Sequence, residues 1–166
     1  VAKDFKLLIP EKEFRFFLTL PKNSPQIKKL YKNAKKKCVQ DSIYNLGKLS
    51  VKECVDAYSS ADICFMPSLL EVFSASYLEA MQMSVPILAS DLDFAREICG
   101  EAAIYFNPLS SKDAASKIEE LINDNSLNSR LVSNGKERLK KYPQNKLKFE
   151  LLDQFISKIV KETKLS

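Results

Sequence analysis

Residues 61–90 have the sequence ADICFMPSLLEVFSASYLEAMQMSVPILAS. The stretch begins with an apolar run at 62–68 and ends with another at 86–90. Both runs are short and almost continuously apolar, which is typical of strands that a fold covers on both faces. Between them, a helix is expected to begin at Ser74 or Ser76 and to run to Met83. This strand–helix–strand unit predicts an α/β fold with a parallel sheet.

The same alternation continues on both sides of this stretch. Ser24 followed by Pro25 marks one helix start, and Ser50 with Glu53 forms a capping box at another. We therefore expect a Rossmann-like parallel sheet with helices on both faces, in a single domain of residues 1–166 that ends in a helical tail at 111–166. The other strands are expected at 14–20, 42–46 and 103–106, and the other helices at 1–9, 25–38, 51–58, 94–99, 111–124, 126–141 and 145–161.

The composition excludes several common enzyme classes. The chain has no histidine, so it cannot use a Ser-His or Cys-His relay, and it lacks the commonest transition-metal ligand. Its three glycines cannot form a Walker loop or a dinucleotide-binding fingerprint. No apolar run approaches the length of a membrane span. The four cysteines fall in apolar patterns without a Cys-x-x-Cys pair and predict buried thiols in the reducing cytoplasm: Cys38, Cys54, Cys64 and Cys99.

The net charge of +5 is concentrated in two lysine-rich stretches, 28–37 and 130–164. Most such runs are solvated helix faces, and the lack of interleaved aromatic residues argues against a nucleic-acid partner. The alternative is a separate functional hypothesis, a basic adaptor whose lysines attract an anionic membrane, an acidic partner or, as the least favoured partner, RNA.

The loop after the strand at 62–68 carries two acids, Glu71 and Glu79, separated by seven residues. Ligands of parallel α/β sheets bind beyond the carboxyl ends of the strands, so this loop is a candidate binding site. Its turn into a helix offers backbone amides and the positive end of the helix dipole, which suit a diphosphate without a glycine-rich loop. A carboxylate on each side of the turn can accept hydrogen bonds from sugar hydroxyls.

Around these acids the sequence resembles the retaining glycosyltransferases of the GT-B architecture, family 4 within glycosyltransferase group 1. In that family, two glutamates with this spacing mark the donor site. The resemblance covers most of the chain. The matching segments are Pro67-Ser68, LEAM at 78–81, Val85-Pro86, ASD at 89–91, Arg96-Glu97 and residues 102–108.

The resemblance implies the C-terminal, donor-binding half of a GT-B fold, lacking its first strand. Glu71 would be the catalytic-site acid that holds hydroxyls of the transferred sugar, and Glu79 would hold the ribose hydroxyls. Backbone amides around residues 73–75 would bind the diphosphate, and Lys48 and Leu49 would border the base. The implied donor-binding residues are Glu71, Val72, Phe73, Ser74, Ala75, Glu79, Lys48 and Leu49.

The implied parent enzyme transfers a hexose from a nucleotide diphosphate sugar to a saccharide or lipid-linked acceptor, in bacterial polysaccharide or glycolipid biosynthesis. It would act in the cytoplasm or peripherally on the inner face of the plasma membrane, with no cofactor and no metal. The family's Gly-Arg and Lys-Gly pattern, whose basic residues neutralise the leaving diphosphate, does not occur here. We therefore expect the partner to be a missing N-terminal acceptor-binding domain, and this chain alone to be inactive.

Other interpretations of the same residues remain open. Ser76 and Glu79 fit a capping box, Glu71 fits an exposed loop acid, Ser74 fits an ordinary N-cap and Lys48 fits a surface lysine. Asp91-Leu-Asp93 has the spacing of a metal chelate, although Asp93 also fits a helix cap. Finally, the family usually has glycine where this chain has Val72, Ser74 and Ser84. That departure favours a second hypothesis, a degenerate module that binds a nucleotide or a partner without catalysis.

Overall fold

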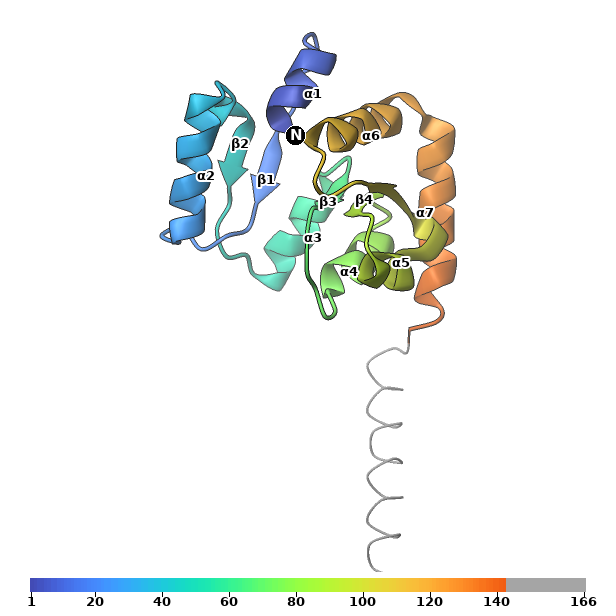
Figure 1. Cartoon of the computed structure of the whole chain (residues 1–166). Helices are drawn as coiled ribbons and strands as arrows, with labels where there is room; N and C mark the ends of the chain where they lie inside the picture. Colours follow the sequence, from blue (N-terminus) through green and yellow to red (C-terminus); the bar gives the residue numbers. More distant parts are fainter. Residues whose placement is uncertain (143–166) are drawn as a thin grey trace, which may run out of the picture.

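The computed structural model describes residues 1–142, and its elements alternate between helix and strand as the sequence predicts (Figure 1). The expected helix at 145–161 lies outside the described residues. No helix in the described part is long and apolar enough to cross a membrane. The strands are β1 (Phe16–Leu18), β2 (Ile43–Asn45), β3 (Cys64–Met66), β4 (Ile87–Ser90) and β5 (Ala103–Phe106). The helices are α1 (Ala2–Leu8), α2 (Pro25–Lys36), α3 (Val51–Ser59), α4 (Ala75–Gln82), α5 (Asp93–Cys99), α6 (Ser111–Asn123) and α7 (Asn125–Leu139), with short 3-10 turns η1 (Gln40–Ser42) and η2 (Gly100–Ala102).

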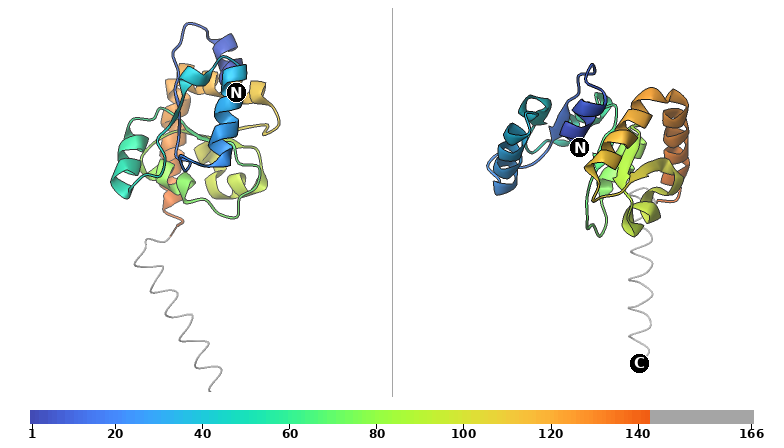
Figure 2. Two further views of the ribbon diagram at one scale, coloured as in Figure 1. Left: turned by 90° about the vertical axis from the view of Figure 1, so that its left-hand side faces the viewer. Right: turned by 45° about the horizontal axis from the view of Figure 1, so that its top comes forward.

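The strands form two parallel sheets instead of one continuous sheet. One sheet pairs β1 with β2, and the other has the order β3-β4-β5. In the described residues no backbone hydrogen bond joins β1 to β3. The right view of Figure 2 shows β2 and α2 set apart from the three-stranded sheet and its helices.

The facing edges of the two sheets can be identified from their hydrogen bonds. The amide of Leu46 donates to the carbonyl of Leu18, so the backbone groups of the preceding residue of β1, Phe17, point away from β2. The amide of Cys64 donates to the carbonyl of Pro86 beside β4, so the backbone groups of Phe65 point away from β4. Side chains bridge the space, since the ring centroids of Phe16 and Phe65 lie 6.0 Å apart.

The core lies on both faces of the three-stranded sheet, and β4 at its centre is buried along its whole length. One face packs against α4 and α5 through side chains such as Tyr77, Ile98 and Cys99. The other packs against α1 and α6 through Phe5 and Leu121, among others. This arrangement confirms the expected helices on both faces of a parallel sheet.

Several predicted helix boundaries are confirmed by hydrogen bonds. The Ser24 hydroxyl accepts from the Ile27 amide at the start of α2. Ser50 and Glu53 form the expected reciprocal capping box on α3. At its other end, α5 stops at Gly100, which has a positive φ of 52°.

Other expectations about burial were wrong. The strand expected at 14–20 is only three residues long, and Phe17 is exposed because β1 is an edge of its sheet. Val51 and Val55 recur at helical spacing in α3, a pattern typical of a buried stripe, yet both face solvent. Cys38 is exposed because the chain turns there with a positive φ of 54° after α2 ends; of the four thiols only Cys99 is fully buried.

Candidate functional site

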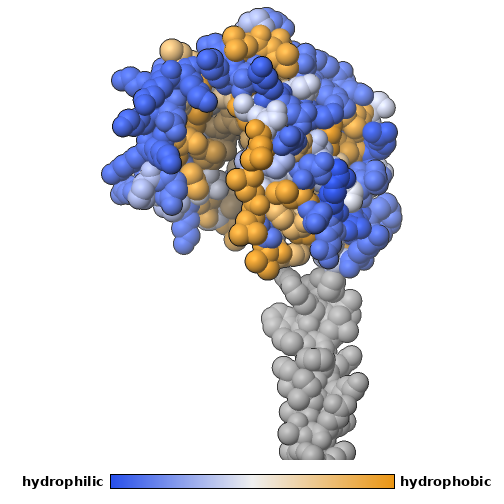
Figure 3. All heavy atoms as spheres, in the orientation of Figure 1, coloured by the Kyte–Doolittle hydropathy of each residue, from blue (hydrophilic) through white to orange (hydrophobic). Residues whose placement is uncertain are grey.

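The loop between β3 and α4 lies at the edge where the strands end, together with the loops after β1 and β2 (Figure 1). Its apolar side chains face solvent: Leu70 is 86% exposed and Val72 97%, and Leu69 and Phe73 are more than half exposed. Figure 3 shows an apolar strip over this loop, beside a hollow in the surface. The loop therefore presents an open apolar surface that no other part of residues 1–142 covers.

The start of α4 has unused hydrogen-bond donors. Ser74 occupies the N-cap position, but its side chain makes no capping hydrogen bond, in contrast to the serines that cap α2, α3 and α6. Within residues 1–142, the backbone amides of residues 73–77 have no hydrogen-bond acceptor. Ser74 therefore has the N-cap position that the alternative interpretation expects, but among the described residues its hydroxyl does not cap the helix. Amides in this position, at the positive end of a helix, suit an anion.

Glu79 lies in the body of α4, because the helix starts at Ala75. The alternative in which Ser76 and Glu79 form a capping box at the helix start is therefore wrong. Instead, the Tyr58 hydroxyl on α3 donates a 3.0 Å hydrogen bond to Glu79 Oε2. Burial raises the pKa of Tyr58, and the Glu79 carboxylate adds to the effect, so the phenol keeps its proton near neutral pH.

Tyr58 is a site residue that sequence reasoning missed. Its position in the helical pattern of α3 indicated a core residue. The structure shows it half-buried, with its ring against the core and its hydroxyl at the edge where Glu79 lies. No motif in the sequence pairs these two positions, which are 21 residues apart.

Glu71 lies partly buried in the loop itself. Tyr77 lies in the first turn of α4, and its pKa is raised to about 12, mainly by burial and then by Cys99. The negative charge of Glu71 lies close enough to add to this rise. The Tyr77 side chain is fully buried, and its hydroxyl has no partner among the described residues. The interpretation of Glu71 as a freely exposed loop acid is thus not what the structure shows.

The three positions where the family usually has glycine differ in backbone geometry. Val72 and Ser74 have ordinary negative φ angles, so glycine's conformational freedom is not needed at either position. Ser84 has a φ of 59°, in the left-handed region that favours glycine, just after α4 ends. Of the three departures, only that at Ser84 strains the backbone, and it does so about one helix length from the turn.

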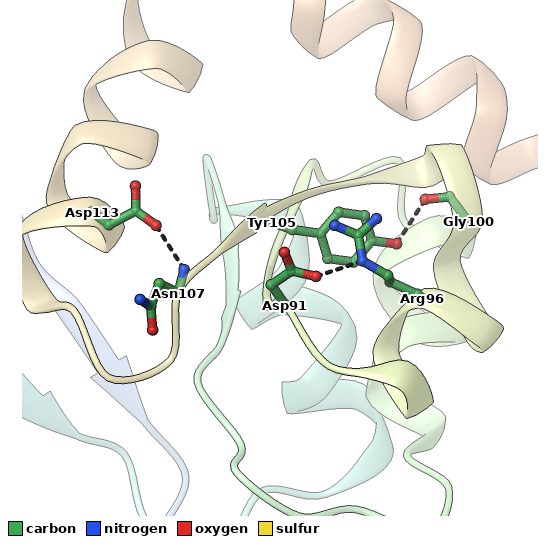
Figure 4. Close-up of polar contacts among 6 residues, drawn as sticks. All are labelled: Asp91, Arg96, Gly100, Tyr105, Asn107 and Asp113. Carbon is green, nitrogen blue, oxygen red and sulfur yellow. Dashed lines mark hydrogen bonds and ion pairs between the residues drawn. The ribbon is translucent and has the colours of Figure 1, made fainter.

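Asp91, the first acid of the Asp91-Leu-Asp93 sequence, is held by an arginine. The Arg96 guanidinium hydrogen-bonds the Asp91 carboxylate and holds its pKa below the ordinary value (Figure 4). Arg96 also stacks on the Tyr105 ring at 4.3 Å, and the Tyr105 hydroxyl donates to the Gly100 carbonyl. Asp93 is the first residue of α5 and not its cap, which is Leu92.

Nearby, the Asn107 amide donates to Asp113, which ties the end of β5 to α6.

Lys48 and Leu49 follow β2 at the same edge. Lys48 is exposed and Leu49 is partly buried. Among the described residues, no hydrogen bond or ion pair links Lys48 to the loop before α4. Their contact with a base therefore stays a prediction.

A hollow of about 360 Å³ lies elsewhere, at the amino ends of β1 and β2. Its walls mix both charges and include Lys6, Glu13, Arg15, Asp41 and Tyr44. Its position at the opposite ends of the strands is unlike that of ligand sites in parallel sheets. We therefore regard the turn before α4 as the candidate site.

Within residues 1–142, no group of three or more Cys, Asp or Glu side chains is placed to hold a metal ion.

Comparison with known proteins relates the chain to one family. The model of the family "Glycosyl transferases group 1" matches residues 5–138. The capsular polysaccharide biosynthesis glycosyltransferase CapM of Staphylococcus aureus is 26% identical over 115 residues, which are 68% of this chain and 30% of CapM. The chain thus spans less than a third of the length of that relative.

Solved structures show the same fold. The C-terminal domain of the group 1 glycosyltransferase LpcC from Francisella tularensis superposes with a TM-score of 0.68 at 22% identity, covering 84% of this chain and 76% of that one. Anabaena HepE in complex with UDP-glucose gives a TM-score of 0.75 at 14% identity, covering 95% of this chain and 53% of HepE. The described elements match the C-terminal half of a GT-B glycosyltransferase over most of their length.

Proposed function

The chain belongs to the glycosyl transferases of group 1, and we propose that it binds the nucleotide diphosphate sugar from which a retaining family 4 enzyme transfers a hexose. The observation that carries this proposal is the start of α4. There, the backbone amides of residues 73–77 have no acceptor in the described part of the chain, and Glu71 and Glu79 flank the turn in sequence. HepE, which has this fold, is known in complex with UDP-glucose.

In this proposal, each part of the turn binds a different part of the donor. The amides of Phe73, Ser74 and Ala75 donate hydrogen bonds to the diphosphate, and the helix dipole of α4 adds to the attraction. Glu79 accepts from the ribose hydroxyls, in a position fixed by Tyr58. Glu71 accepts from hydroxyls of the transferred sugar. The base lies toward Lys48 and Leu49, on the loop that leads into α3.

We propose that the whole protein also contains an acceptor-binding half and one more strand of this domain. The chain spans 30% of CapM, which leaves room for both. The space between β1 and β3 supports the extra strand, because the backbone groups of Phe17 and Phe65 face it and have no partner among residues 1–142. An added strand between β1 and β3 would join the two sheets into one, in the order β2, β1, added strand, β3, β4, β5. This is the order of a doubly wound fold in which the added strand comes first in the chain and lies at the centre of the sheet. The exposed apolar loop at 69–73 supports contact with another domain.

The proposed reaction adds the hexose to a saccharide or lipid-linked acceptor in bacterial polysaccharide or glycolipid biosynthesis, in the cytoplasm. The relative CapM supports this assignment, because it acts in capsular polysaccharide biosynthesis. We propose further that the donor site needs no metal. Asp91, the first acid of the Asp91-Leu-Asp93 sequence, is engaged by Arg96. Donor binding that disappears with a chelator would contradict this part of the proposal.

Calorimetric titration of the chain with UDP and UDP-glucose tests the proposed site. Binding should weaken about tenfold or more in Glu79→Ala, for UDP and UDP-glucose alike, because a carboxylate–hydroxyl hydrogen bond is lost. Glu71→Ala should weaken UDP-glucose binding but leave UDP binding nearly unchanged. Glu13→Ala removes an exposed acid at the other end of the strands and serves as the matched control. Unaltered binding in both site variants would overturn the proposal.

The same titration distinguishes catalysis from the degenerate-module hypothesis. We expect the isolated chain to bind UDP-glucose without transferring glucose, because transfer requires a closed cleft between two halves. Addition of the acceptor half should restore transfer, which a chromatographic assay of the glycoside product measures. Binding that persists while the complete protein transfers no sugar would favour the degenerate module.

A further inference from the structure

We propose that the outer face of α2 is a binding surface for the anionic headgroups of a lipid membrane. The proposal is independent of the donor site. It rests on five lysines at positions i, i+1, i+4, i+7 and i+8 of the helix, a spacing that places them on one face. These lysines are Lys28, Lys29, Lys32, Lys35 and Lys36, and all five are exposed.

The structure fixes the direction in which this lysine face points. Ile27 and Ala34 are buried on the opposite side of α2. The Tyr31 hydroxyl bonds the carbonyl of Ile43 and the amide of Asn45, both at 3.2 Å, which holds α2 against β2. The left view of Figure 2 shows α2 running along the front of the molecule with no element over it. The lysine face, about 12 Å long at the rise of an α-helix, is therefore open to solvent.

The charge on this face is not balanced by neighbouring acids. No Asp or Glu occurs between Glu13 and Asp41, and that interval contains eight cations. Within the described residues, no lysine of α2 takes part in an ion pair. Like charges three and four residues apart destabilise a helix, and surfaces that serve only solubility mix both signs. An unmixed row of lysines suits an external polyanion.

The chemistry of the face favours a membrane over other polyanions. Lysine is a point charge that suits diffuse attraction, whereas recognition of nucleic acids favours Arg and stacked aromatic rings. α2 has no Arg, and its one aromatic residue, Tyr31, is bonded to β2. Lysine is also depleted in protein–protein interfaces. A convex helix with a straight row of lysines can approach a flat surface of anionic lipids along its whole length.

Sedimentation with lipid vesicles tests this surface. The chain should bind vesicles of phosphatidylcholine that contain about one-third phosphatidylglycerol, and not vesicles of phosphatidylcholine alone. Raising the salt from about 0.1 M to about 0.5 M should release it, because exposed charges are screened. Equal binding to neutral vesicles would overturn the proposal.

Two variants with the same net charge locate the binding. Replacement of Lys28, Lys32, Lys35 and Lys36 by Gln should reduce the partition coefficient about tenfold or more. The control replaces four exposed lysines elsewhere, Lys52, Lys112, Lys136 and Lys141, by Gln and should change it at most about threefold. Both variants retain residues 143–166. An equal loss in the two variants, or tighter binding to single-stranded RNA than to anionic vesicles at the same salt, would refute the assignment.

Discussion

The hydroxyl of Tyr58 on α3 donates a 3.0 Å hydrogen bond to Glu79 on α4. The same hydroxyl lies 3.5 Å from the carbonyl of Ser76, one turn earlier in α4. The contact ties the helix that follows β2 to the helix that follows β3, at the edge of the sheet where the donor is proposed to bind. Tyr58 therefore sets the position of the Glu79 carboxylate before any ligand arrives.

Tyr58→Phe should weaken UDP binding about three- to tenfold, because Glu79 loses the hydrogen bond that orients it. Titration calorimetry measures the change. Tyr31→Phe is a matched control, since it also removes a hydroxyl that bonds a neighbouring element, but far from the donor turn. If the two variants bind UDP equally well, Tyr58 has no positioning role.

Ser84→Gly should stabilise the chain by about 0.5–1 kcal/mol, because glycine adopts the left-handed conformation without the steric cost that Ser84 bears. Chemical denaturation monitored by circular dichroism gives the free energy of unfolding. Ser116→Gly, at an exposed position inside α6, should instead destabilise by about 0.5 kcal/mol. Destabilisation by both changes would show that the φ of Ser84 carries no strain in solution.

Gly135→Val should destabilise the chain by about 1–3 kcal/mol through overpacking. A Cβ at position 135 would lie 3.2 Å from Met81 Cγ, which is tighter than ordinary van der Waals contact, so Met81 would have to shift to make room for a larger side chain. Because α4 carries Glu79, UDP affinity should fall together with the thermal midpoint. Ser133→Val, on the exposed side of α7, should leave both unchanged, and a similar loss there would argue against the close approach.

Asp91→Asn should make the chain less stable at neutral pH but not in strong acid. The Arg96 guanidinium lowers the pKa of Asp91 in the folded protein, so the pair contributes stability above the unfolded pKa of an aspartate. That contribution disappears as the pH falls through the folded pKa and Asp91 is protonated. Because both side chains are largely exposed, the effect on the unfolding midpoint should be small. A difference between the two proteins that persists below that pKa would contradict this explanation.

The sequence predicts the order of the elements well, because its signals for them are local. Ser24, Ser50 and Gly100 mark helix ends through contacts within a few residues, and the apolar run at 86–90 marks a strand buried on both faces. The separation of β1 from β3 leaves no such signal, since it depends on which strand edges find partners. Strand lengths were overestimated because pairing between strands, and not the apolar pattern, decides where a strand ends. At 14–20, the apolar pattern continues beyond the three residues that pair.

For the candidate site, the sequence identifies the turn and both acids but not their surroundings. The spacing of Glu71 and Glu79 is visible in the sequence, whereas the contact of Glu79 with Tyr58 and the burial of Tyr77 beside Glu71 arise from packing between elements. The free state of the Ser74 hydroxyl was equally hidden. A serine before a helix predicts a cap on average, and only the geometry shows that this one makes no capping hydrogen bond.

The most direct test of the donor turn is nuclear magnetic resonance of the ¹⁵N-labelled chain during titration with inorganic pyrophosphate and, separately, with UDP. Pyrophosphate probes the anion site without regard to the base. The amide signals of residues 73–77 should shift most with both ligands, because these donors lack acceptors in the free protein. Signals near Tyr58 and Glu79 should shift with UDP alone. Absence of shifts in residues 73–77, or shifts concentrated at the hollow around Arg15 and Tyr44, would contradict the account.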